Sequence, residues 1–442
     1  MGSVGRVGSS VDLLVLGAGP AGLAAAWRAA RRGLSVTVLE RSDTVGGLAG
    51  SFTVAGVRVD HGSHRLHPAT PPRLLADLRR LLGDDLQLRQ RRGRLRVAGR
   101  WVDFPLRASQ VARTLPPSML VRIAAEAVAE PVRRPRADTY AEVLRAGIGR
   151  TLYQAVYGPY AEKLWGLPGE RISGEQARRR VTADTPWKIA SRMLRGRRGA
   201  GQGRVFYYPR RGYGQIAQAL ADAADAAGAS ILTGTPVDEI DLTGDSVRAA
   251  AGGTHVEAPH AFSTVPLSAL ATLTRPGPPR SVVDAAAQLR FRAMVLVYLV
   301  HSGGRWTPYD AHYIPGPETA VTRISEPANY RDSADDPSGH TVVCAEIPCA
   351  VGDETWRAGD ATLRALAEDA LAATGLPSIH VTDVVVRRVP RVYPVYESGY
   401  DSHLALLDEW ATSLPRVTTF GRLGLFAHDN THHAMVMAYD AV

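Results

Sequence analysis

Three glycines near the N-terminus have the spacing of a phosphate-binding turn. Gly17, Gly19 and Gly22 follow an apolar run and open a helical pattern. In such a turn the first glycine permits a tight bend, the second lets the backbone approach a phosphate, and the third lets the helix pack on the strand. Amides at the helix N-terminus and the helix dipole then hold a pyrophosphate. We therefore predict that a dinucleotide is bound by Gly17, Gly19, Pro20, Ala21 and Gly22.

An acidic residue supports this prediction. Glu40 ends the second apolar run, SVTVLE, 18 residues after Gly22. A carboxylate at that place accepts hydrogen bonds from ribose hydroxyls, and its charge disfavours a 2′-phosphate. The strand, glycine turn, helix, second strand and acid fall in the register of one βαβ unit. The alternative is a plain βα turn without a ligand.

The elements that must position these residues extend along the whole chain. Buried strands are expected at 11–16, 35–40 and 261–266, helices at 20–32 and 215–229, and several strands within 291–394. The layout predicts an α/β fold with a Rossmann-type dinucleotide domain assembled from the discontinuous segments 11–105, 204–285 and 395–442. An inserted α+β substrate domain is expected, with a helical part at 106–203 and a sheet part at 286–394.

The distribution of charge along the chain bears on whether it binds nucleic acid or a membrane. The net charge of +9 comes almost entirely from arginine, with denser patches around Arg133, Arg134 and Arg136 and over 192–204. Neither patch is interleaved with aromatic residues and no nucleic-acid motif occurs, so no nucleic-acid partner is predicted. A helix with one apolar side is expected over 119–132, followed by arginines. We expect it to pack on neighbouring helices, and stable membrane association is not predicted.

The chain also lacks the marks of a membrane or disulfide-rich protein. The first ten residues are small and polar, and we expect a disordered leader there and no signal peptide. Nothing approaches 18 consecutive apolar residues, so no transmembrane helix is expected. Cys344 and Cys349 are predicted to be buried thiols without a disulfide framework, which fits a reducing cytoplasm. No metal site is predicted.

The residues after Glu40 indicate which dinucleotide fits. Arg41, Gly46, Gly47 and Leu48 stand in ERSDTVGGLAG. This run resembles the second glycine pair of the flavoprotein superfamily that contains amine oxidases, protoporphyrinogen oxidases and UDP-galactopyranose mutases. An arginine can reach the pyrophosphate there, and the glycine pair lets a loop run flat over the cofactor. The resemblance implies that the cofactor is FAD and that the Rossmann-type domain is an FAD-binding domain.

A second segment resembles the same superfamily. Residues 60–67, DHGSHRLH, are similar to the GPHxFH segment of the mutases, with Ser63 in place of proline. In that family the segment lies against the isoalloxazine ring, so the resemblance implies flavin contacts at Gly62, Ser63 and His64. His64 is the candidate catalytic residue, because an imidazole can tune charge near flavin N5. The alternative for His64 is a turn histidine bonded to backbone.

The C-terminal run resembles the mutases most closely. Residues 421–433, GRLGLFAHDNTHH, align without a gap with their GRLATYxYxDMHQ motif. The resemblance implies that this segment holds the ribityl chain and the pyrimidine edge of the flavin, through Gly421, Arg422, Asn430, Thr431, His433 and Ala434. The run TPVDEI resembles the strand whose backbone meets the adenine, which implies a contact at Val237.

Two kinds of chemistry are compatible with these motifs. In the first, a hydride moves from a small-molecule substrate (an amine, a sugar derivative or a biosynthetic intermediate) to flavin N5. The alternative is a non-redox sugar isomerase that uses reduced FAD, as the mutases do, and the abundant arginines suit its anionic diphosphate. In the mutases, tyrosines of the C-terminal motif bind the diphosphate. Phe426 and His428 stand at those positions here. This departure favours the redox reaction. A flavin-binding scaffold or sensor is the third possibility.

The predicted substrate segments contain five further polar candidates, which are Tyr309, His312, Arg323, Glu326 and Tyr396. Each is more simply explained as a structural or surface residue than as a catalytic one. The expected partner is a small-molecule substrate, and the chain is expected to be a monomer or a homodimer.

Overall fold

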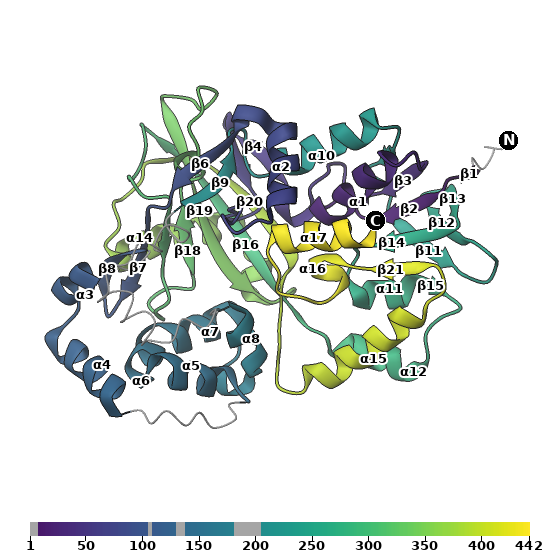
Figure 1. Ribbon diagram of the computed structural model, residues 1–442. Helices are drawn as coiled ribbons and strands as arrows, with labels where there is room; N and C mark the ends of the chain where they lie inside the picture. Colours follow the sequence, from purple (N-terminus) through teal and green to yellow (C-terminus); the bar gives the residue numbers. More distant parts are fainter. Residues whose placement is uncertain (1–7, 105–107, 130–137, 181–204) are drawn as a thin grey trace.

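The computed structural model describes residues 8–104, 108–129, 138–180 and 205–442 (Figure 1). Within them, one five-stranded sheet is parallel throughout, with the strand order β10 (Ser230–Leu232), β3 (Val36–Leu39), β2 (Leu13–Leu16), β14 (His260–Ser263) and β21 (Val417–Thr419). Strands β2 and β3 are buried along their whole length, as expected for apolar runs in a parallel sheet. Helix α1 (Pro20–Ala30) connects them, which confirms the predicted βαβ unit.

Helices and a second sheet cover the two faces of this parallel sheet. On one face α1 packs against α10 (Gln215–Ala226) and against α17 (Thr431–Ala441), the yellow helix beside α1 in Figure 1. The other face packs against a second five-stranded sheet and the helices α11 (Leu267–Leu273), α12 (Arg280–Gln288) and α15 (Tyr400–Ser413). This layered arrangement is the predicted α/β Rossmann-type architecture.

The second five-stranded sheet corrects one expectation about the N-terminus. Its strand order is β1 (Gly8–Ser10), β13 (Thr254–Ala258), β12 (Val247–Ala251), β11 (Val237–Asp241) and β15 (Thr274–Arg275). The prediction of a disordered leader was wrong for residues 8–10, because their backbone pairs in parallel with β13. These small polar residues have no apolar pattern that would predict a strand. A strand at the edge of a sheet can nevertheless form, because it pairs through backbone groups alone.

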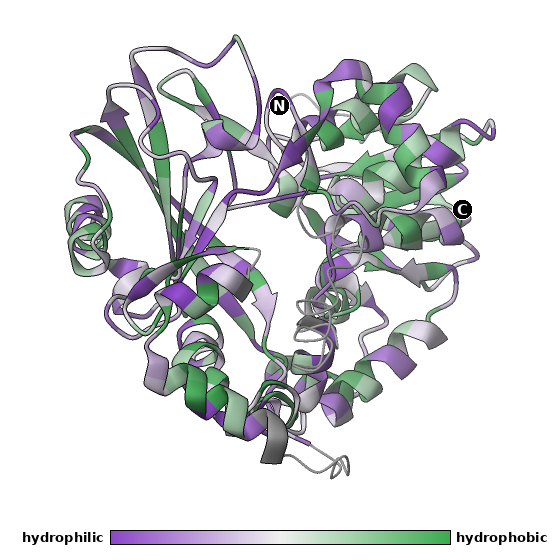
Figure 2. Cartoon of the chain, turned by 60° about the vertical axis from the view of Figure 1, so that its left-hand side comes forward, coloured by the Kyte–Doolittle hydropathy of each residue, from purple (hydrophilic) through white to green (hydrophobic). Residues whose placement is uncertain are grey.

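A seven-stranded sheet forms the other large unit. Its order is β20 (Val381–Pro394), β16 (Phe291–Ser302), β19 (His340–Cys349), β18 (Arg323–Ser325), β17 (Ala311–Tyr313), β7 (Gly93–Val97) and β8 (Arg100–Phe104). One face packs against the helices between residues 140 and 177 and against the hairpin around residues 54–59. The other face packs against α14 (Asp360–Thr374). Strands β16 and β19 are buried along most of their length, and Figure 2 shows green, hydrophobic stretches on the long strands at its left-hand side. Cys344 and Cys349 lie on β19 as buried free thiols, which confirms that prediction.

The helical group lies on one side of this sheet (Figure 1). Its described helices are α3 (Ala108–Thr114), α4 (Pro117–Ala129), α5 (Tyr140–Ile148), α6 (Arg150–Leu152), α7 (Gly158–Trp165) and α8 (Gly174–Arg180). Helix α5 starts with a capping box between Thr139 and Glu142. The two arginine-rich patches predicted at 133–136 and 192–204 lie outside the described residues. Among the helices that are described, none is long and apolar enough to cross a membrane.

Segments that are far apart in sequence thus share each sheet. Strands from residues 13–39, 230–263 and 417–419 form the parallel sheet, whereas β7 and β8 join the seven-stranded sheet with residues 291–394. The division of the chain into a cofactor domain and an inserted substrate domain stays a prediction.

Candidate functional site

In the turn after β2, positions 17 and 22 have room only for glycine. Gly17 has φ +101°, and a Cβ placed on it would lie 2.5 Å from Thr264 Oγ1. A Cβ on Gly22 would lie 2.0 Å from the carbonyl oxygen of Gly17. At Gly19, by contrast, a Cβ would meet nothing within 4 Å, so the backbone there borders open space. No side chain caps the N-terminus of α1. The turn therefore fits a phosphate group that accepts hydrogen bonds from the first helix amides.

Glu40 lies at the carboxyl end of β3, beside this turn. Its Oε2 accepts a hydrogen bond from Ala18 N at 2.8 Å, and its Oε1 accepts one from Ser42 N at 2.9 Å. Each oxygen keeps a second lone pair for a ligand hydroxyl. The backbone N–H of Thr235 donates to the Glu40 carbonyl at 2.8 Å and brings the start of β11, at Val237, toward the same edge.

Three separate segments meet around the turn. Gly46 N donates to the Ala18 carbonyl at 2.8 Å, and a Cβ on Gly47 would lie 3.6 Å from Gly19 Cα. Gly47 is the first residue of the short helix η1 (Gly47–Ala49), which contains Leu48. From the other end of the chain, a Cβ on Gly421 would lie 3.3 Å from Ala21 Cβ. The predicted N-terminal and C-terminal cofactor segments therefore lie side by side.

The C-terminal segment presents a second helix N-terminus. Helix α17 begins after Asn430, which gives it no side-chain cap, and the first hydrogen bond within the helix runs from Ala434 N to Asn430 O at 3.2 Å. The amides of residues 431–433 consequently lack an acceptor within the helix. His433 is exposed, and its Nδ1 lies 3.7 Å from Asp429 Oδ1.

The guanidinium of Arg422 is engaged by the protein itself. Nη1 donates to the carbonyl of Asp429 at 2.6 Å, and Nη2 donates to the carbonyl of Val392 at 2.7 Å. Arg422 therefore fastens the segment before α17 to β20. Arg41, in contrast, is exposed on the loop after β3.

The segment Gly62–His64 lies against the seven-stranded sheet. Ser63 N donates to Glu346 Oε1 at 2.9 Å, and Ser63 Oγ lies 2.5 Å from the hydroxyl of Tyr330. His64 stacks on Tyr213 with 5.2 Å between ring centroids. Its Nδ1 lies 3.2 Å from the carbonyl of Gly62, the backbone contact expected of a turn histidine. Burial lowers the pKa of His64 to about 4, so the imidazole is neutral at pH 7.

A row of side chains crosses the sheet beside this segment. Glu346 on β19 pairs with Arg323 on β18, and Arg323 pairs with Tyr313 on β17. Directly opposed residues of neighbouring strands point to the same face, so these three side chains lie together. Arg323 Nε and Nη2 donate to the two oxygens of Glu346 at 2.9 and 2.6 Å. Because Glu346 also accepts from Ser63, the row and the Gly62–His64 segment form one site.

Two further arginines converge on the end of the row. Arg65 Nη1 donates to the hydroxyl of Tyr313 at 3.0 Å, and its Nη2 pairs with Asp310 Oδ1 at 3.0 Å. Arg91 Nη2 donates to the same hydroxyl at 3.3 Å. We call Arg65, Arg91, Tyr313, Arg323 and Glu346 the arginine–tyrosine row.

The charges around Tyr313 change its acidity. Desolvation raises the pKa of this phenol, but Arg65, Arg91 and Arg323 together outweigh it and lower the pKa to about 7. A phenol is ordinarily protonated at neutral pH. Tyr313 is thus a group that both gives and takes a proton near pH 7, and it lies beside the segment predicted to face the flavin.

Two of the five candidates from the substrate segments serve as buried structural groups. Glu326 accepts from the backbone amides of residues 306 and 307 at 3.0 and 3.1 Å. His312 accepts from Arg94 Nε at 3.2 Å, and burial lowers its pKa to about 3. His312 thus joins β17 to the neighbouring strand β7, and Glu326 joins the loop at residues 306–307 to Thr341 on β19.

Two others also make contacts within the protein. The hydroxyl of Tyr396 donates to the carbonyl of Phe426 and accepts from His428 N, both at 3.1 Å. The ring of Tyr309 lies 4.2 Å from the guanidinium carbon of Arg94. Of the five, only Arg323 belongs to the arginine–tyrosine row. Sequence reasoning missed Arg65, Arg91, Tyr313 and Glu346, although the single acid within the apolar run VVCAEIPC was a usable signal at position 346.

Comparison with known proteins identifies the family to which this chain belongs. The family model described as flavin containing amine oxidoreductase matches residues 20–433. No protein with a curated description matches the chain. A solved structure of reduced UDP-galactopyranose mutase aligns with a TM-score of 0.81 at 22% identity, covering 98% of this chain and 94% of that one.

Two further solved structures share the fold. A protein from Exiguobacterium named as a protoporphyrinogen oxidase aligns with a TM-score of 0.75 at 18% identity, covering 99% of both chains. A putrescine oxidase with bound putrescine aligns with a TM-score of 0.67 at 18% identity, covering 98% of this chain and 99% of that one. These likenesses support the fold, and the family match covers most of the sequence. The chain belongs to the family of flavin-containing amine oxidoreductases and is an FAD-dependent enzyme.

Proposed function

We propose that this enzyme oxidises a C–O or C–N bond of a small molecule, with Tyr313 as the proton acceptor. The observation that carries the proposal is the hydroxyl of Tyr313, which receives hydrogen bonds from two guanidinium groups beside Gly62–His64. Bound FAD supplies the hydride acceptor of such a reaction at its N5 position. The protein must then orient the substrate and take up the proton.

We assign the cofactor to the glycine segments that meet around α1. In this assignment the pyrophosphate is held by the amides after Gly19, and the ribose hydroxyls bond to Glu40. Gly62, Ser63 and His64 would contact the isoalloxazine ring, and the amides at the N-terminus of α17 would hold its pyrimidine edge. The open space at Gly19 and the uncapped helix ends support this placement. The remaining predicted contacts stay proposals at Pro20, Ala21, Arg41, Gly46, Gly47, Leu48, Val237, Gly421, Arg422, Asn430, Thr431, His433 and Ala434.

The proposed role of Tyr313 follows from its acidity. A general base works best when its pKa lies near the working pH, and the pKa of Tyr313 is lowered to about 7. As the hydride leaves the substrate carbon, the proton on the substrate oxygen or nitrogen passes to the phenolate oxygen of Tyr313. Arg65 and Arg91 stabilise that phenolate before the transfer through charge-assisted hydrogen bonds.

One observation supports the mutase-like alternative. Within the described part of the chain, Arg65, Arg91 and Arg323 face two carboxylates, Asp310 and Glu346, which leaves one positive charge unbalanced while Tyr313 is protonated. The diphosphate of a nucleotide sugar would balance it.

The residues at the two mutase tyrosine positions weigh against this alternative. Phe426 is buried in an apolar cluster with its ring 4.9 Å from that of Phe291, and His428 is 4% exposed. Neither side chain offers the hydroxyl that a tyrosine would present to the diphosphate.

Anaerobic mixing separates the two reactions. Candidate alcohols, amines and UDP-galactopyranose are added to the oxidised holoenzyme while the flavin absorbance is followed. We expect at least one alcohol or amine to bleach the flavin without added reductant. Turnover of the nucleotide sugar only after reduction with dithionite would support the mutase-like alternative. A protein that purifies colourless and takes up no FAD on reconstitution would contradict both.

A further inference from the structure

A cavity of about 290 Å³ is lined in part by Asp310, whose carboxylate pairs with Arg65. Three chain segments surround it. They are residues 88–92, which lead into β7, residues 305–310 before β17, and residues 329–332 at the end of η5 (Pro327–Tyr330). None of the residues assigned above to FAD lines it. The cavity is therefore a feature separate from the cofactor segments.

Arginines dominate the wall of this cavity. Arg89, Arg92 and Arg305 line it, and Arg92 and Arg305 are exposed. No hydrogen bond or ion pair of the Arg92 guanidinium occurs among the described residues. Arg305 Nη1 donates to the neutral Asn329 Oδ1 at 2.9 Å. Arg89 Nη1 lies 3.9 Å from Asp332 Oδ2, and this aspartate side chain is 85% exposed, so the pair is weak.

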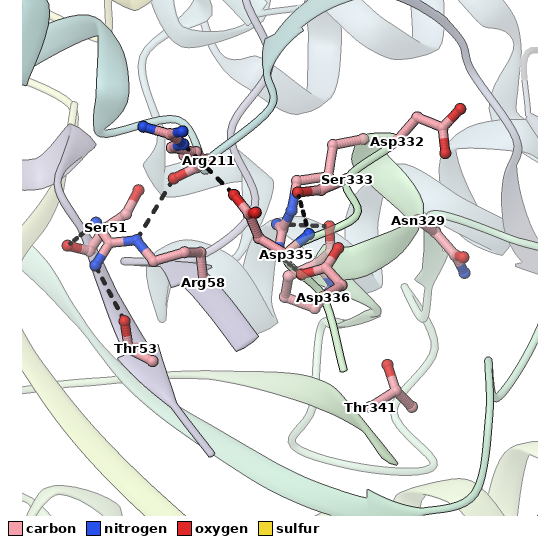
Figure 3. A network of polar contacts seen from close by, with 12 residues as sticks. Ser51, Thr53, Arg58, Arg211, Asn329, Asp332, Ser333, Asp335, Asp336 and Thr341 are labelled. Atoms are coloured by element: carbon pink, nitrogen blue, oxygen red, sulfur yellow. Dashed lines mark hydrogen bonds and ion pairs between the residues drawn. The ribbon is translucent and has the colours of Figure 1, made fainter. Parts of the chain in front are cut away.

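Among the described residues, the nearby carboxylates bond mainly to other groups. Glu326 interacts electrostatically with Arg305, but its oxygens accept from the backbone amides of residues 306 and 307. Asp310, which lines the cavity, uses Oδ1 for Arg65 and Oδ2 for the backbone N–H of Arg92 at 3.0 Å. Asp336 pairs with Arg331, which is itself buried, and Asp335 lies 3.5 Å from Arg211. Figure 3 shows Arg211 directed toward Asp335, within a network that continues to Arg58 and Thr53. The cavity thus keeps an excess of positive charge.

We propose that this cavity binds the phosphate group of a small metabolite. Guanidinium groups present planar pairs of N–H donors that match the oxygens of a phosphate. Arg92 and Arg305 approach from two different segments, so one oxyanion between them would receive donors from both sides. The volume suits a phosphate with a short organic portion and is below that of most pockets for larger ligands. This inference does not depend on the reaction proposed above.

Calorimetric titration of the holoenzyme with inorganic phosphate tests the site, at constant ionic strength so that screening does not change. The variant is the double substitution Arg92→Gln and Arg305→Gln, which removes two exposed charges without opening the core. Arg280→Gln is the matched control, because this arginine is 86% exposed on α12 and pairs with Asp284 in the neighbouring turn. Thermal unfolding without phosphate verifies that all three proteins are equally folded.

We expect phosphate to bind the wild type and the Arg280→Gln control with one site, and to bind the double variant at least about tenfold more weakly, since two charge-assisted contacts are lost. Unchanged affinity in the double variant would overturn the proposal, because phosphate would then be held elsewhere, for example at the arginine–tyrosine row. Absence of binding to the wild type would overturn it too. Neither result bears on flavin reduction by substrate.

Discussion

The substitution Gly22→Ala is expected to give a protein that purifies without FAD. A Cβ at this position would lie 2.0 Å from the carbonyl oxygen of Gly17, far inside contact distance, so the first turn of α1 must move away from β2. The amides proposed to hold the pyrophosphate move with it. Backbone atoms cannot rotate aside as a side chain can, so we expect FAD affinity to fall by about 100-fold or more. Flavin absorbance per protein after gel filtration measures the loss.

Gly147→Ala is the matched control for this substitution. Gly147 lies within α5, has no positive φ, and a Cβ on it would meet nothing within 4 Å. Alanine there should raise the free energy of unfolding by about 0.5–1 kcal/mol and leave FAD content unchanged. Full flavin content in Gly22→Ala, with unfolding like that of the wild type, would show that the cofactor does not depend on this turn.

The substitution Tyr313→Phe is expected to lower the rate of flavin reduction by substrate about 10²- to 10⁴-fold, the usual contribution of a general base. The base must be deprotonated to act, so the wild-type rate should rise with pH through about 7, the pKa of Tyr313, and be constant above it. In Tyr313→Phe this rise should disappear. Stopped-flow reduction of the flavin under anaerobic conditions, measured across the pH range, gives both quantities.

Two variants distinguish proton transfer from a merely structural role of Tyr313. Arg91→Met removes one donor from the Tyr313 hydroxyl while the Arg323–Glu346 pair stays intact, so the rise in rate should move to higher pH. Tyr309→Phe is the control, because Tyr309 packs on Arg94 away from the row, and its pH profile should match the wild type. If Tyr313→Phe keeps the wild-type rise, another group accepts the proton.

Local sequence patterns were sufficient to predict the cofactor fold. Gly17, Gly22 and Glu40 fall within one βαβ unit, where strand, turn and helix are adjacent in the chain. The positive φ of Gly17 and the contact between Gly22 and Gly17 both arise inside this unit. The C-terminal segment was predicted from a motif, and the contact between Gly421 and Ala21 agrees with that placement. The leader was misjudged because Gly8–Ser10 pair through backbone atoms, which leave no trace in side-chain type.

The arginine–tyrosine row could not be predicted in the same way. Tyr313, Arg323 and Glu346 come together only through the register of three strands, and a shift by one residue would turn each side chain to the opposite face. Arg65 and Arg91 reach Tyr313 from two further segments of the chain. Only Glu346 carried a local signal, as a charged residue within a buried strand, because a buried carboxylate requires a partner.

The most direct test is a crystal structure of the oxidised holoenzyme with FAD and a substrate bound anaerobically. The isoalloxazine ring should lie against Gly62–His64, with the substrate between it and the arginine–tyrosine row and the reacting oxygen or nitrogen within hydrogen-bond distance of the Tyr313 hydroxyl. A ring placed away from Gly62–His64, or a substrate that leaves Tyr313 without contact, would contradict the account.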